Sequence, residues 1–127
     1  NETEAELISG GPVCTVEEAA ACAVALLGKG FRRVVITLGA RGSLIADSAG
    51  HVHVPPFHVT AVDTTGAGDA FIGSFAVFLA EGVPERDALA RANLYAALST
   101  TRIGTQKSFP PRADFEAEWA RGCKPAR

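Results

Sequence analysis

The 127 residues contain no methionine. They also carry no strong excess of charge of either sign and no long apolar run. Because even an initiator methionine is missing, we expect the chain to be a piece of a longer protein. The net charge of −2 and the pI near 5.9 give no electrostatic footprint for a nucleic-acid or membrane-surface partner. No apolar run approaches the roughly 18 to 20 residues of a membrane span, so we expect neither a membrane segment nor an apolar leader.

Metal-binding and disulfide patterns are also missing. The three cysteines contain no CxxC pair, which predicts free thiols in a reducing cytoplasm at Cys14, Cys22 and Cys123. No cysteine or carboxylate cluster completes a zinc site around the histidines, so we expect surface positions for His51, His53 and His58.

What is present suits one domain of modest size, because 47% of the residues are hydrophobic and 20% are charged. Helical spacing and capping signals predict helices over residues 1–9, 15–27, 67–81, 84–101 and 112–121. The β-branched run at 33–39 predicts a strand buried on both faces, and residues 42–47, 51–55 and 57–62 are shorter strand-like pieces. Residues 103–111 are expected to form a loop. The alternation predicts an α/β sandwich.

One stretch, VDTTGAGDAFIGSFA at residues 62–76, combines a glycine-rich loop with the start of a helix. Backbone N–H groups at the positive end of a helix dipole make an anion site, and glycines let a phosphate approach. A carboxylate at Asp69 would repel that phosphate unless an acceptor hydroxyl lies between them. The stretch therefore favours a phosphoryl-transfer site with Asp69 as base. The alternative is a plain strand-to-helix connection with a favourable first-turn acid.

Two other phosphate motifs are excluded. The segment GDAFIGS has the glycine spacing of a P-loop but no lysine, and GAGDAF lacks the third glycine of a dinucleotide-binding motif. A Rossmann dehydrogenase is excluded on the same ground.

The motif DTTGAGDAF resembles the C-terminal signature of the ribokinase family of carbohydrate kinases. Three further segments resemble motifs of that family in the same order: NETE at 1–4, VITLGARG at 35–42 and TTRIGTQKSFP at 100–110. The resemblance runs to about residue 110. It implies the C-terminal, nucleotide-binding part of a three-layer α/β/α sandwich, with the sugar-binding and lid part absent from these 127 residues.

The resemblance also implies roles for single residues. Asp69 would be the general base that contacts the sugar hydroxyl, and Gly66, Ala67 and Gly68 would form the anion hole. Glu4 would hold Mg²⁺ through water. The ATP site would comprise Asn1, Thr37, Leu38, Gly39, Ala40, Arg41, Gly42, Gly68, Asp69 and Asn93. The alternatives are a simple helix cap at residues 1–4, a tight turn at 37–42 and exposed polar surface at Asn93.

A potassium-type cation would be held by oxygens of Asp63, Thr65, Ser99, Arg102, Gly104 and Ser108. Carboxylate, carbonyl and hydroxyl oxygens suit a hard cation, and Arg102 could offer only its backbone carbonyl. The cation would order the neighbouring anion-hole loop. Taken alone, Asp63 could equally be an ordinary turn aspartate.

The activity implied is that of a kinase that converts ATP and D-ribose to ADP and ribose 5-phosphate. Fructose, a deoxysugar or a nucleoside are alternative substrates, and a non-catalytic nucleotide-binding fragment is the alternative of another class. The resemblance further implies Mg²⁺, K⁺ and a homodimer formed through the absent lid. We expect the isolated 127 residues to be inactive as a kinase.

Overall fold

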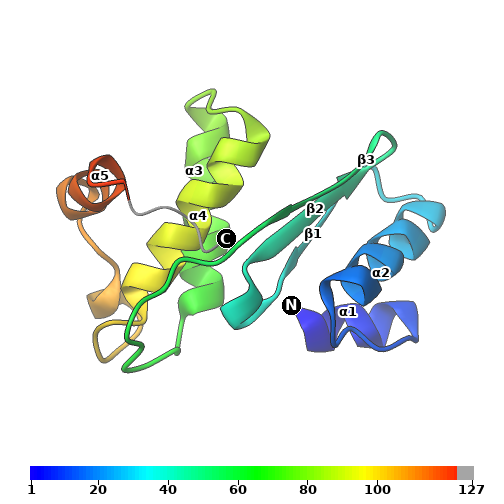
Figure 1. Cartoon of the computed structure of the whole chain (residues 1–127), viewed down its shortest axis with the longest axis horizontal. Coiled ribbons are helices and arrows are strands. Elements are labelled where there is room, and N and C mark those ends of the chain that lie inside the picture. The colour runs from blue at the N-terminus through cyan, green and yellow to red at the C-terminus, as the bar shows by residue number, and fades with distance from the viewer. Residues whose placement is uncertain (123–127) are drawn as a thin grey trace. The chain divides into compact units, whose positions relative to one another are not determined.

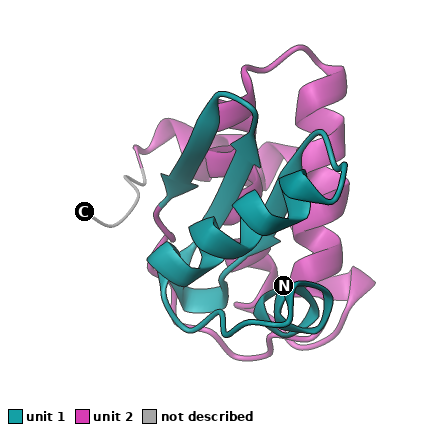
Figure 2. Cartoon of the chain, turned by 90° about the vertical axis from the view of Figure 1, so that its right-hand side faces the viewer, with its two compact units in different colours: residues 1–54 teal, residues 55–127 magenta. Residues whose placement is uncertain are grey.

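A computed structural model describes residues 1–122 of the chain, which leaves the predicted thiol of Cys123 outside the described residues. The chain divides into two compact units, Asn1–Val54 and Pro55–Arg127 (Figure 2). The two other cysteines are free, as predicted: Cys14 is exposed and Cys22 is buried. Every helix within the described residues is too short or too polar to cross a membrane.

Unit 1 begins with two helices, α1 (Glu2–Ser9) and α2 (Val16–Gly28), each started by a capping box. The side chain of Asn1 accepts a hydrogen bond from the N–H of Glu4, and the side chain of Thr15 does so from Glu18. In both boxes the glutamate side chain bonds back to the capping residue, which satisfies N–H groups that a helix leaves free. The two helix starts are confirmed.

The sheet of unit 1 is antiparallel, in the order β1 (Val34–Thr37), β2 (Ser43–Asp47) and β3 (Gly50–Val54). A short 3₁₀ turn, η1 (Gly39–Arg41), joins β1 to β2. Figure 1 shows α1 and α2 on one side of these strands. Their alanines and leucines pack with Ile36 and Leu44 in one apolar core.

The prediction that residues 33–39 form a strand buried on both faces is wrong. Val35, Ile45 and Val52 form a cross-strand row on the sheet's other face. Val35 is 37% exposed and Val52 is 36% exposed, although the central Ile45 is buried. Within unit 1, α1 and α2 cover one face only, so the flanking valines of the second face stay partly open.

Unit 2 is helical, with α3 (Ala67–Ala80), α4 (Glu85–Ser99) and α5 (Arg112–Ala120). Pro84 is the residue before α4 rather than part of its first turn, and the predicted loop at 103–111 contains a 3₁₀ turn, η2 (Gln106–Ser108). Phe78 and Phe115 lie at the centre of the core, with ring centroids 5.3 Å apart. Trp119 of α5 is partly buried and packs against this core.

The strand predicted at residues 57–62 does not form. A strand needs a neighbour to accept its ladder of hydrogen bonds, and the described residues supply none there. The N–H groups of Val62 and Asp63 instead donate to one carbonyl, that of Thr100, at 2.7 and 3.0 Å. The chain is thus a mixed α/β structure, as predicted, with one small antiparallel sheet.

Candidate functional site

The loop before α3 exposes the start of that helix. Gly66 is the residue that caps α3, and its φ of 80° lies in the left-handed region that glycine adopts without strain. The N–H of Ala67 donates to the carbonyl of Thr64 at 3.2 Å. Within residues 1–122, the N–H groups of Gly68 and Asp69 have no acceptor. Two free donors thus lie at the positive end of the helix dipole, where an anion is stabilised.

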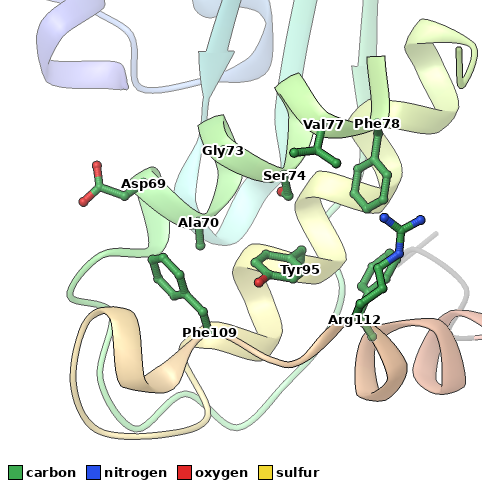
Figure 3. A pocket seen from close by; sticks show the side chains of 10 residues that line it. Asp69, Ala70, Gly73, Ser74, Val77, Phe78, Tyr95, Phe109 and Arg112 are labelled. Carbon is green, nitrogen blue, oxygen red and sulfur yellow. The ribbon is translucent and has the colours of Figure 1, made fainter. Parts of the chain in front are cut away.

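Asp69 stands in the first turn of α3 and is exposed. Figure 3 shows its carboxylate directed away from the side chains of Ala70, Ser74 and Tyr95. Those three residues help to line a cavity of about 230 Å³ beside the helix. The cavity is mainly apolar, and the hydroxyl of Tyr95 donates to the carbonyl of Pro110 at 3.0 Å. Two charged residues, Asp69 and Arg112, also line it, and the Arg112 guanidinium pairs with Glu81 at 2.7 Å.

Asp63 ties the loop before α3 to the segment after α4. One carboxylate oxygen accepts the N–H of Thr65 at 2.9 Å, and the other accepts the N–H of Gly104 at 3.0 Å. Hydrogen bonds from the Thr65 side chain and from these two N–H groups lower the pKa of Asp63 to about 2. The carboxylate is therefore fully ionised at neutral pH.

The other predicted cation ligands lie in the same unit. Ser99 and Ser108 are buried, and their hydroxyls donate to the carbonyls of Ala96 and Thr105 at 2.7 and 2.6 Å. Each hydroxyl oxygen keeps lone pairs that can accept or coordinate. The Arg102 guanidinium, which lies 3.9 Å from Asp114, is itself a cation without an acceptor atom, so only the backbone carbonyl of Arg102 suits a cation.

Asp63 accepts hydrogen bonds from the backbone N–H groups of two of the other predicted ligands, Thr65 and Gly104. The structure shows no such direct contact for Ser99, Arg102 or Ser108. Within residues 1–122, no three His, Cys, Asp or Glu side chains gather as a metal site. A cation here would therefore depend on carbonyl and hydroxyl oxygens around one carboxylate, which fits a hard monovalent ion.

The predicted ATP loop, residues 37–42, is a tight turn in unit 1. The N–H of Leu38 donates to Gly42 at 2.8 Å, and the N–H of Arg41 donates to Leu38 at 2.9 Å. Leu38 is buried, whereas Ala40 and Arg41 are more accessible. The guanidinium of Arg41 pairs with Glu2 at 3.1 Å, which brings this loop to the start of α1. Asn1 and Glu4 of the capping box lie at that same helix start.

Asn93 lies in the middle of α4 and is only 8% exposed, so the alternative that it is exposed polar surface is wrong. Its side-chain amide donates to the carbonyl of Pro55 at 3.3 Å. Unit 1 thus holds residues 1, 4 and 37–42 of the predicted site, whereas unit 2 holds Asn93 and the rest.

Sequence reasoning missed several residues that shape these loops. Thr100 accepts the N–H groups of Val62 and Asp63 through its backbone, which no side-chain pattern signals. Thr105 lies 3.4 Å from where a Cβ on Gly66 would stand. His53, predicted as a surface residue, is half-buried and contacts the carbonyl of Arg41.

Comparison with known proteins identifies the family of the chain. Residues 1–112 match the family model described as pfkB family carbohydrate kinase. A deoxyribokinase of Salmonella typhi is 44% identical over 115 residues, which cover 91% of this chain and 38% of that protein. A ribokinase of Mus musculus is 44% identical over 119 residues, which cover 91% of this chain and 37% of that protein.

Solved structures give the same result. A ribokinase from Thermotoga maritima superposes with a TM-score of 0.85 at 40% identity, over 94% of this chain and 40% of that one. A ribokinase from Arabidopsis thaliana, complexed with ribose and ATP, has a TM-score of 0.85 at 31% identity. The match covers 92% of this chain and 38% of that one.

These likenesses define the class of the fold, a fragment of the ribokinase-like α/β fold. The chain belongs to the pfkB family of carbohydrate kinases, which confirms the predicted resemblance. It spans 38% and 37% of the length of the two relatives named above.

Proposed function

We propose that the complete polypeptide containing this chain is an ATP-dependent sugar kinase whose general base is Asp69. The observation that carries the proposal is the start of α3, where an exposed carboxylate stands beside free N–H groups of Gly68 and Asp69. A base and an anion site side by side suit the transfer of a phosphoryl group to a hydroxyl.

In the proposed reaction, the Asp69 carboxylate accepts the proton of a sugar hydroxyl. The hydroxyl oxygen bonds to the γ-phosphorus of ATP as the bond to the β,γ-bridging oxygen breaks, which leaves ADP and a sugar phosphate. The loop of Gly66, Ala67 and Gly68, joined by the N–H of Asp69, stabilises the charge on the transferring group. The ATP side comprises residues 37–42 with Asn1 and Asn93.

Two cations belong to the proposal. A potassium-type ion would be held by the oxygens around Asp63, where the carboxylate already orders the loop through Thr65 and Gly104. Glu4 has an exposed carboxylate that could bind hydrated Mg²⁺ through a water. A bound Mg²⁺ would neutralise part of the negative charge of the ATP phosphates.

D-ribose is our proposed substrate, and a deoxysugar is the first alternative. The two relatives described above are named for ribose and deoxyribose kinases, at the same 44% identity. A solved fructokinase at 32% identity extends the alternatives to fructose. We further propose that the complete protein is a three-layer α/β/α sandwich, with this chain as its C-terminal part and the sugar-selecting groups in the remainder.

The test is a panel of sugars with ATP, read as ADP release by the complete polypeptide with and without potassium. Asp69→Asn should lower kcat by about 100-fold or more, because the base is lost while the shape is kept. Asp87→Asn is the matched control, since Asp87 is an exposed acid in the first turn of α4. It should leave kcat unchanged.

Each outcome has a distinct meaning. Potassium-stimulated turnover of ribose that collapses only in Asp69→Asn supports the base, the cation and the substrate together. Turnover of another sugar keeps the mechanism and changes the substrate. Turnover that survives Asp69→Asn refutes the role of Asp69, and absence of turnover with every sugar favours the non-catalytic nucleotide-binding alternative.

A further inference from the structure

His53 on β3 lies outside every motif that predicted the site, yet it reaches the loop at residues 39–42. Its Nε2 atom is 2.7 Å from the carbonyl oxygen of Arg41. A carbonyl oxygen can only accept, so Nε2 carries the hydrogen and donates. The ring is half-buried, with Leu44 of β2 as its neighbour across the ladder.

Arg41 is held at its other end as well. Its Nη2 atom donates to Oε1 of Glu2 at 3.1 Å, and Glu2 is the first residue of α1. A Cβ on Gly39 would lie 3.8 Å from the same Glu2 oxygen, so the loop and the start of α1 are close at this point. The backbone of Arg41 is thus bonded to β3, and its side chain is bonded to α1.

We propose that His53 and Glu2 are positioning residues for the nucleotide side of the site. Together they fix the 39–42 loop between β3 and α1, the helix whose start carries Asn1 and Glu4. This inference rests on the proposed function, because it assigns the two residues to the binding of ATP. Neither residue is among those proposed to contact ATP, so each acts through Arg41.

The loop needs such support because its own hydrogen bonds are few and short in range. They join Leu38, Gly39, Arg41 and Gly42 only to one another. Gly39 and Gly42 have φ values of 52° and 90°, a backbone that few other residues would keep. Glycines increase the number of backbone conformations that the loop can adopt without ATP. The bonds from His53 and to Glu2 reduce that number, so less conformational entropy is lost when ATP binds.

The test compares four forms of the complete polypeptide: wild type, His53→Phe, His53→Gln and His51→Phe. Phenylalanine keeps the ring shape but removes the donor, whereas the glutamine side chain offers an amide N–H. His51 is the matched control, since it lies two residues away on β3, is exposed and makes no side-chain hydrogen bond within residues 1–122.

We expect His53→Phe to raise the KM for ATP by about three- to tenfold, as befits one lost hydrogen bond. The KM for the sugar and kcat should stay close to wild type, a split that general destabilisation does not produce. His53→Gln should recover most of the loss, and His51→Phe should behave as wild type. Glu2→Gln should raise the same KM, since it weakens the ion pair with Arg41.

A second measurement does not depend on turnover. Hydrogen exchange at the N–H groups of Leu38, Arg41 and Gly42 should be faster in His53→Phe than in wild type or His51→Phe. Unchanged exchange, or a KM for ATP that matches wild type in His53→Phe, overturns the inference. A wild type without ATP-dependent turnover refutes the proposed function itself, and with it the role in ATP binding, even if the exchange result holds.

Discussion

Gly66 is the position where one added methyl group tests the geometry of the loop before α3. Its φ of 80° places it in the left-handed region, and it has no Cβ to oppose Thr105. A Cβ built there would meet Cα of Thr105 at 3.4 Å and Cβ of Thr105 at 3.5 Å. Gly66→Ala therefore adds a conformational strain and a contact at the limit of ordinary packing.

The strain and the contact set the expected loss of stability in Gly66→Ala. A left-handed conformation costs an L-residue about 1–2 kcal/mol, and the contacts near 3.4 Å add little if Thr105 yields slightly. Alanine also lowers the entropy of the unfolded chain, which offsets roughly 0.4–1 kcal/mol. We expect Gly66→Ala to lower the free energy of unfolding by about 1 kcal/mol.

Gly68→Ala is the matched control, two residues further along. Gly68 lies inside α3 with a helical backbone, and a Cβ there would meet nothing within 4 Å. Alanine is the better helix former, so this variant should gain about 0.5–1 kcal/mol. In urea unfolding, the free energy of unfolding should fall below that of wild type in Gly66→Ala and rise above it in Gly68→Ala. The two variants should therefore differ from each other by about 1.5–2 kcal/mol.

Activity separates the two variants again. Under the proposed function, a phosphate approaches the backbone at Gly68, so Gly68→Ala should lower kcat by about tenfold or more although the fold is more stable. Measured ADP release by the complete polypeptide gives this value. The reasoning about the loop is wrong if Gly66→Ala unfolds like wild type or if Gly68→Ala is the less stable variant.

Two further predictions concern unit 2. Because hydrogen bonds from Thr65 and Gly104 depress the pKa of Asp63 to about 2, its ionised form stabilises the fold above its ordinary pKa of 3.8, and this contribution is lost as the pH falls toward 2. In Asp63→Asn, the urea midpoint should depend less on pH between about 4 and 2 than it does in wild type. An unchanged pH dependence would count against the hydrogen bonds from Thr65 and Gly104 to Asp63. Phe115→Ala should lower the free energy of unfolding by about 3–5 kcal/mol, because this fully buried ring packs on Phe78, Tyr95 and Trp119. Phe31→Ala, at a ring that is 55% exposed, is its control and should change unfolding by less than about 0.5 kcal/mol in the same assay.

The helices were predictable because their signals are local. Each capping box at Asn1 and Thr15 is formed by residues three apart, and α3 begins where a left-handed glycine meets a helical pattern. Such signals need no knowledge of the rest of the chain. The predicted ends of these helices accordingly lie within a few residues of the observed ones.

Strands and burial depend on distant neighbours, and there the predictions were right only in part. Strands form at Val34–Thr37, Ser43–Asp47 and Gly50–Val54, within three of the four predicted segments or close to them. Residues 57–62 have a strand-like composition, but their backbone lies beside Thr100 rather than beside another strand. Val35 has the β-branched character of a doubly buried strand, yet only one face of its sheet is covered within unit 1. Asn93 is polar and mid-helix, and only the fold places it beneath the carbonyl of Pro55.

The predicted site residues of the two units differ in the same way. Around Asp69, the proposed base and the N–H groups come from adjacent residues. The hydrogen bond that Gly104 N–H donates to Asp63 joins two motifs already identified in the sequence. Around Arg41, the holding groups His53 and Glu2 belong to no motif and were found only in the structure. Because the residues around Asp69 lie in unit 2 and those around Arg41 lie in unit 1, substitutions should separate by the step they affect. Under the proposed function, changes at residues 63–69 should act mainly on kcat, and changes around Arg41 mainly on the KM for ATP.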